Sequence, residues 1–141
     1  MKSIYTISIL LSLVFFGCSK DFLKKYENRI VGIWRIADVK RVGIGGDTGN
    51  LPFKEGVCKF HENGTLEFTN PANQVYQGTW EIIKKTINEQ TIRSLQITAV
   101  DFNGQQVLSE YYDDMNFRNT DHFVGHIVYN FHTYVTHFRR M

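Results

Sequence analysis

Apolar and polar residues alternate along most of the chain after Tyr26. The alternation is clearest at residues 65–69 and 76–82, where almost every second residue is apolar. A period of two is typical of a β-strand that buries one face and exposes the other to water. No stretch of this region shows a convincing helical period, so the pattern predicts an all-β domain.

Short clusters of turn-forming residues separate the alternating segments. Glu62-Asn63-Gly64 and Phe102-Asn103-Gly104 offer the positive-φ residues that tight hairpins require. Consecutive antiparallel strands close into an up-and-down barrel or stack as a β-sandwich, and periodicity alone does not separate the two. The segments between turns predict about eight antiparallel strands, at residues 30–41, 57–61, 65–70, 75–83, 91–100, 107–117, 122–129 and 132–140.

The N-terminal residues have a different pattern. Lys2 precedes an apolar and hydroxylic run at residues 4–16, and Gly17 and Cys18 follow it. This run is shorter than the roughly 20 apolar residues that a transmembrane helix needs, and its layout is that of a secretory signal peptide. We therefore expect a signal peptide at 1–17, a tether at 18–29 and a single β-domain at 30–141. The alternative is a core helix with a small buried cysteine.

The junction before Cys18 resembles the lipobox of bacterial lipoproteins, in a loose form familiar in the Bacteroidota. The resemblance implies that Cys18 is acylated and becomes the mature N-terminus. Each buried methylene of an acyl chain contributes about 0.8 kcal/mol, so several chains hold a protein firmly on a membrane. The expected location is the cell envelope, with the outer membrane favoured and its periplasmic or surface face left open.

Charge and cysteine content narrow the possible functions. The chain has 16 Lys and Arg against 14 Asp and Glu, and the loss of Lys2 with the signal peptide brings this balance nearer to zero. With so little net charge, the protein has no strong positive electrostatic field to attract nucleic acid, and we expect no nucleic-acid partner.

The second cysteine is expected to be structural. If Cys18 is acylated, Cys58 has no cysteine partner, and its alternation with Phe60 predicts burial in the core.

Two Gly-x-Trp sequences, Gly32-Ile33-Trp34 and Gly78-Thr79-Trp80, resemble those of lipocalins and of the small lipocalin-like lipoproteins of Bacteroidota. The hairpin at 60–68 is similar to that of the same lipoproteins. The resemblance implies a lipocalin-like barrel in which Trp34 closes one end and an arginine of the last strand, Arg139 or Arg140, lies across its ring. A cation in that position contributes about 0.5 to 2 kcal/mol.

Four histidines between His122 and His137 raise the question of a metal. His122 and His126 share one strand face, and a tight turn near residues 130–131 brings His137 diagonally between them. Three imidazoles at that spacing are almost close enough together to bind one zinc ion, and Asp121 is the nearest candidate for a fourth ligand. Because no cysteine joins them, ordinary sheet residues are the favoured interpretation, and no metal or cofactor is predicted.

Signatures of catalysis are missing from the sequence. Asp113 and Asp114 are adjacent and point to opposite faces of a strand, as do Cys58 and His61, and no nucleophile elbow is present. We therefore expect no enzyme. The glycine-rich stretch at 43–49 lacks the ending of a phosphate loop, and the segment 42–56 is expected to cross the mouth of the domain, where a ligand would enter.

Aromatic residues are the remaining distinctive feature, and they either fill the core or line a pocket. The leading hypothesis is a membrane-anchored module that binds a small apolar or amphipathic ligand inside its barrel. The alternative is an envelope interaction or inhibitor module with a filled core, whose protein partner the sequence does not identify. The predicted interior residues are Trp34, Tyr76, Trp80, Tyr111, Phe117, Phe123, Tyr129 and Phe131.

Overall fold

The structure is a computed structural model that describes residues 25–44 and 51–141. The predicted signal peptide and Cys18 lie outside these residues. In the described part no helix has the length and apolarity to cross a membrane. The all-β prediction is confirmed, and the elements are α2 (Tyr26–Ile30), β1 (Gly32–Gly43), β2 (Gly56–Phe60), β3 (Thr65–Thr69), β4 (Val75–Ile87), β5 (Gln90–Asp101), β6 (Gln106–Tyr112), β7 (Asp114–Asn119), β8 (His122–Val128) and β9 (His132–Arg140).

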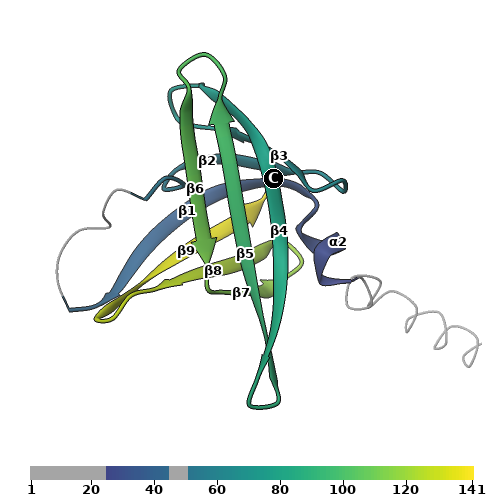
Figure 1. Ribbon diagram of the computed structural model, residues 1–141, viewed down its shortest axis with the longest axis vertical. Coiled ribbons are helices and arrows are strands. Elements are labelled where there is room, and N and C mark those ends of the chain that lie inside the picture. Colours follow the sequence, from purple (N-terminus) through teal and green to yellow (C-terminus); the bar gives the residue numbers. More distant parts are fainter. Residues whose placement is uncertain (1–24, 45–50) are drawn as a thin grey trace, which may run out of the picture.

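All nine strands belong to one antiparallel sheet in the order β6-β5-β4-β3-β2-β1-β9-β8-β7. The sheet folds over itself, so that β4, β5 and β6 cross in front of β1, β9, β8 and β7, and the core lies between these layers (Figure 1). Strands β6 and β7 follow one another in the chain but do not pair. The sheet is therefore not closed into a barrel, and the sandwich alternative fits it better.

The missing pair results from a corner at Asp113. The sequence predicts one strand over 107–117, whereas the chain breaks there into β6 and β7. The Ser94 hydroxyl donates a hydrogen bond to the Asp113 carbonyl at 2.8 Å, and the Val128 amide donates to the Asp113 carboxylate at 2.7 Å. These bonds hold the point where the chain passes from one layer to the other.

The two predicted hairpin turns lie where the sequence places them. Gly64 has φ of 79°, as expected for the first turn. In the second turn the positive φ belongs to Gln105, at 54°, and not to the Asn103-Gly104 pair. The Asp101 carboxylate accepts hydrogen bonds from the amides of Asn103 and Gly104, and this local bonding fixes the turn without a left-handed glycine.

Aromatic rings fill the space around Trp34. Trp34 meets Phe123 edge-on with 4.8 Å between ring centroids, and Phe123 stacks on Phe138 at 4.3 Å. Such pairs contribute about 0.5 to 1.5 kcal/mol beyond the area that they bury. Cys58 is fully buried beside them and burial raises the pKa of its thiol, which confirms the core position predicted for it.

The short helix α2 belongs to the folded domain, although the sequence predicts a tether up to residue 29. Its last residue, Ile30, is fully buried. The Tyr26 hydroxyl donates to the Met115 carbonyl at 2.8 Å and accepts from the Phe117 amide at 3.2 Å. Because β7 is an edge strand, these bonds occupy backbone groups that would otherwise be open to pairing with another chain.

Arg140 ties the end of α2 to the core. Its guanidinium carbon lies 4.3 Å from the centre of the Trp34 ring, and its nitrogens donate to the carbonyls of Val31 at 3.0 Å and Arg29 at 2.7 Å. The last carbonyls of a helix lack partners within the helix, so a cation there is stabilising. Of the two arginines expected at this position, Arg140 occupies it and Arg139 does not, because Arg140 pairs opposite Trp34 and Arg139 faces the outside opposite Arg35.

We expect Arg140→Ala to lower the free energy of unfolding by about 2 kcal/mol or more, since it removes charge-assisted hydrogen bonds and the cation over Trp34. Urea denaturation followed by tryptophan fluorescence measures the change. Arg139→Ala is the matched control and should change stability by less than about 0.5 kcal/mol. Equal effects of the two substitutions would contradict the assignment.

Candidate functional site

An open cleft of about 660 Å³ lies at one end of the sheet, where the segment after β1 passes the ends of β3, β4 and β6. Volumes of about 300 to 1,000 Å³ are usual for sites that hold small molecules. Its walls come from parts of the chain that are distant in sequence. They include Leu51 and Lys54 from the segment, Phe68 from β3, Tyr76 from β4, and Gln106 and Leu108 from β6.

The wall formed by residues 51–55 is held in place by packing. Phe53 is almost fully buried and meets Phe68 edge-on at 4.9 Å between ring centroids, and Leu51 packs partly against the core. Gly56 follows at φ of 130°, where a Cβ atom would come within 2.4 Å of the Thr69 carbonyl oxygen. The segment thus stays against the sheet, at the open end where we expect a ligand to enter.

The opposite rim is a turn that its own side chains rigidify. The Asn70 carboxamide oxygen accepts hydrogen bonds from the amides of Ala72 at 3.0 Å and Gln74 at 2.9 Å, while its nitrogen donates to the Gln74 side chain at 2.8 Å. Asn73 takes the left-handed conformation, with φ of 59°. Both rims are therefore formed before any ligand arrives, as is usual for small-molecule sites.

The cleft mixes polar and apolar groups, and polar groups make up more of its exposed lining than apolar groups do. The Tyr76 hydroxyl donates to the Gln106 carboxamide oxygen at 2.9 Å, which leaves the Gln106 amide nitrogen available as a donor. Phe68 and Leu108 supply apolar surface, and Lys54 adds an exposed charge at the edge. This arrangement suits a molecule with an apolar body and a polar end.

The predicted interior aromatics divide into several groups. Trp34, Trp80 and Phe123 are core residues, and Phe117 packs against the core while partly exposed. Tyr76 is the one member of the predicted set that borders the cleft. Among the described residues, the interior around Trp34 is filled with side chains, whereas the open cleft lies at the end of the sheet.

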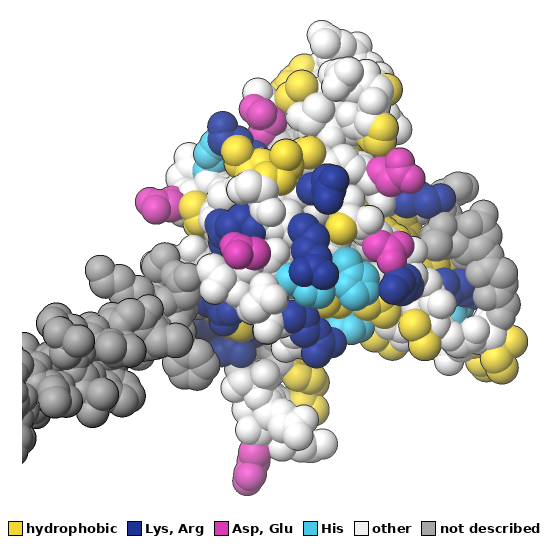
Figure 2. All heavy atoms as spheres, turned by 180° about the vertical axis from the view of Figure 1, so that it is seen from behind, with side chains coloured by type: hydrophobic (Ala, Val, Ile, Leu, Met, Phe, Trp, Pro, Cys, Tyr) yellow, Lys and Arg dark blue, Asp and Glu magenta, His cyan; other side chains and the backbone are white. Residues whose placement is uncertain are grey.

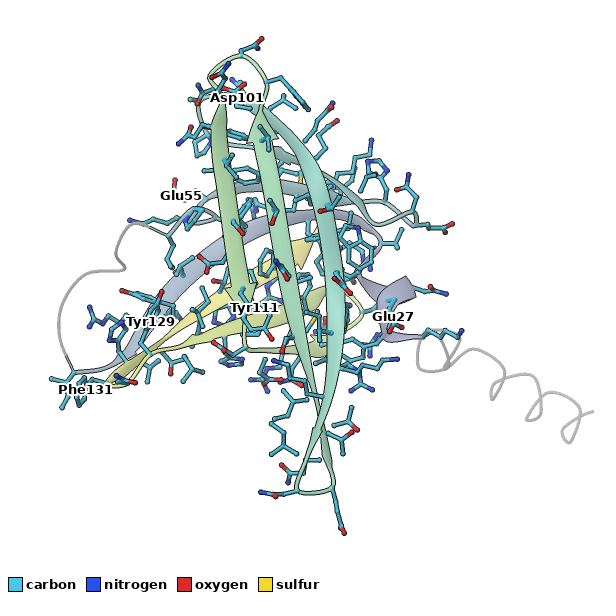
Figure 3. All side chains as sticks on the ribbon, viewed as in Figure 1. Glu27, Glu55, Asp101, Tyr111, Tyr129 and Phe131 are labelled. Carbon is cyan, nitrogen blue, oxygen red and sulfur yellow. The ribbon has the colours of Figure 1, made fainter. Side chains whose placement is uncertain are left out.

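Tyr111, Tyr129 and Phe131 do not face the interior, which corrects their predicted placement. The Tyr111 hydroxyl accepts a hydrogen bond from Lys85 at 2.8 Å on the outer face, and this bond lowers the pKa of Tyr111. Its neighbour Tyr112 points inward, because adjacent strand residues face opposite ways. Tyr129 and Phe131 lie at the β8–β9 turn, 48% and 76% exposed (Figure 3).

Sequence reasoning missed Phe68, Gln106 and Leu108 as site residues. Phe68 carries a signal of burial, because it alternates with polar neighbours on a short strand. Gln106 carries no such signal: it begins a strand after a turn, and its relation to Tyr76 exists only through the pairing of β4, β5 and β6. A contact that depends on the pairing of three strands cannot be predicted from a local sequence pattern.

The histidines adopt the diagonal arrangement expected from the sequence. His137 lies opposite Val124, between His122 and His126. The rings of His122 and His137 stack at 5.3 Å, with Nε2 and Nδ1 3.1 Å apart, whereas His126 lies 3.7 Å from the Asp114 carboxylate. Over residues 25–44 and 51–141, no three His, Cys, Asp or Glu side chains lie together as a metal site requires.

The chain matches no protein-family model, no curated protein and no solved structure.

Proposed function

We propose that the protein is a lipoprotein of the bacterial cell envelope, anchored through Cys18, whose lipocalin-like domain binds a small amphipathic molecule. The observation that carries the binding role is the preformed cleft with the Tyr76–Gln106 pair at its side. The apolar part of the lining favours the body of such a ligand, while the free Gln106 donor and the neighbouring Lys54 and Glu55 favour a polar end.

The filled core supports an amphipathic ligand over a wholly apolar one. A deep barrel cavity would enclose a purely apolar molecule, but here Trp34, Phe123 and Phe138 occupy that space. A ligand in the open cleft keeps one side in contact with water, and a polar group on that side avoids a desolvation cost.

The binding role predicts that Gln106→Trp weakens ligand capture at least tenfold, because the larger side chain fills the cleft and removes the partner of Tyr76. The anionic fluorescent probe 1-anilinonaphthalene-8-sulfonate, titrated into the folded protein, measures this change. Gln96→Trp is the matched control, because Gln96 is exposed on β5 outside the cleft. Equal probe affinity in the two variants would remove the cleft as the binding site.

The anchor predicts that a clickable fatty acid fed to the producing bacterium labels the protein, and that Cys18→Ala abolishes the label. Acylation requires the thiol at the mature N-terminus, so the variant should also leave the membrane fraction. Cys58→Ala is the control, because Cys58 is buried in the core, and it should retain the label. Persistent label on Cys18→Ala would refute the anchor.

A second candidate function, the binding of a protein partner in the envelope, is supported by an exposed apolar tip. Val42 and Val128 both pair with Thr133 on the outer face, and the Ile44 amide donates to the Phe131 carbonyl at 3.2 Å. With Phe131 these side chains are largely exposed. Clustered exposed apolar residues commonly mark interaction sites.

The tip predicts that Phe131→Ser leaves the free energy of unfolding within about 0.5 kcal/mol of wild type, because an exposed ring contributes little to the core. Cross-linking in the native host should recover a stoichiometric protein with wild type and lose it with Phe131→Ser. Phe102→Ser, also at an exposed turn, is the control that should retain it. Identical cross-linking of all three proteins would exclude the tip as a partner site.

A further inference from the structure

Three arginines lie on the outer face of strands β1, β9 and β7. Arg35 of β1 lies directly opposite Arg139 of β9, and Arg139 lies opposite His122 of β8. Arg118 of β7 lies between Phe117 and Asn119, and Asn119 pairs with His122, so Arg118 stands next to the strand position that carries His122. Viewed from behind, Lys and Arg side chains gather near the middle of this face, with His next to them (Figure 2).

Carboxylates lie near these arginines without pairing with them, since Arg35 lines one hollow together with Asp38 and Glu55. Neighbouring cations have carboxylates, with Lys40 at 3.4 Å from Asp38 and Arg140 at 3.6 Å from Asp121. Within the described part of the chain, no carboxylate forms an ion pair with Arg35, Arg118 or Arg139. Like charges directly opposite each other on paired strands are destabilising, so the fold gains nothing from this arrangement by itself.

Two β-bulges flank the cluster. The register of β1 against β9 shifts between Ile36 and Asp38, next to Arg35, and that of β7 against β8 shifts between Phe117 and Asn119, at Arg118. The other strand pairs described carry no such shift. Bulges re-aim side chains and often lie beside functional sites, so their position here points to a use for the two arginines.

The histidine pair adds donors that respond to pH. Burial lowers the pKa of His122, with Arg139, His137 and Arg118 adding to the effect. Burial also lowers the pKa of His137, and Lys40, Arg139 and Arg118 add to this while Asp38 opposes it. The lowered pKa values favour the neutral form of both rings, so these rings gain charge at a lower pH than an ordinary histidine does.

We propose that Arg35, Arg118, Arg139 and the His122–His137 pair form a binding site for a phosphate group. Guanidinium groups present planar forks of donors that match phosphate oxygens, and a dianion offsets most of the charge of three arginines. The site shares no residue with the cleft beside Tyr76, so it goes beyond the function proposed above. The phosphate belongs to a free phosphomonoester or to the headgroup of an anionic lipid.

Calorimetric titration of the full chain with inorganic phosphate tests the site. Arg118→Gln and Arg139→Gln should each weaken binding about tenfold, which is the loss expected for one charge-assisted hydrogen bond. Lys85→Gln is the control, because it removes an equal charge from β4 in the other layer of the sheet, where Lys85 donates to Tyr111, and it should change affinity less than twofold. Equal binding by wild type and both arginine variants would show an adventitious ion only and overturn the proposal.

Stability without added anion gives an independent readout. Since Arg139 repels Arg35, Arg139→Gln should unfold at the same or a higher temperature than wild type in phosphate-free buffer. Phosphate at a concentration near the wild-type Kd should raise the melting temperature of wild type and raise that of the variant much less, because its Kd is about tenfold higher. A variant that phosphate protects as strongly as wild type would contradict the site.

The contribution of the two histidines is tested with sulfate, because its charge stays constant from about pH 8 to about pH 5, the range in which histidine titrates. Wild-type affinity should rise as the pH falls through the lowered pKa values, because protonated rings add attraction. The His122→Gln, His137→Gln double variant should bind sulfate with little pH dependence. A wild-type affinity that is constant across this range would exclude the histidines and overturn the proposed site as a unit.

The source of the phosphate is decided by competition. Vesicles of phosphatidic acid in phosphatidylcholine should displace inorganic phosphate if a lipid headgroup reaches the site, and vesicles of phosphatidylcholine alone serve as the control. Absence of displacement together with tight binding of glycerol phosphate assigns the site to a soluble phosphomonoester. The Gln106→Trp variant should bind phosphate like wild type, which separates this site from the cleft.

Discussion

The pairing of the first strand with the last is the contact on which the rest of the structure depends. Strand β1 runs antiparallel to β9, so the first and last strands pair inside the sheet and its open edges fall at β6 and β7. The same register places Arg140 over Trp34 on the inside and Arg139 against Arg35 on the outside. One pairing thus creates both the stabilising contact with α2 and the unbalanced positive charge on the opposite face.

The position of the cleft follows from how the core is filled. Trp34, Phe123 and Phe138 occupy the space near α2, and Phe53 and Leu51 cover the sheet at the end where the cleft opens. Water-accessible volume therefore lies between this cover and the ends of the strands. Rigid strands hold the Tyr76–Gln106 pair in place, while the covering segment sets the width of the opening.

Most of the fold was predicted from the alternation of apolar and polar residues. Where this prediction fails, the structure shows a specific cause. Residues 107–117 alternate as one strand would, yet Asp113 forms a corner because Ser94 and Val128 bind it from both layers. Tyr111 and Tyr112 are equally good core candidates by type, and the pairing with β5 turns the second one inward. The choice between neighbours depends on a register that no local pattern fixes.

The sequence by itself determined the all-β class, the turn positions, the burial of Cys58 and the diagonal arrangement of the histidines, because all of these follow from alternation and short-range chemistry. Only the tertiary structure decided which arginine meets Trp34, where the cleft opens and where positive charge accumulates. A chain whose charges nearly balance overall still concentrates Arg35, Arg118 and Arg139 on one face. The physical reason is that strand pairing brings together residues about 20 to 100 positions apart, and their separation in the sequence leaves no trace of that contact.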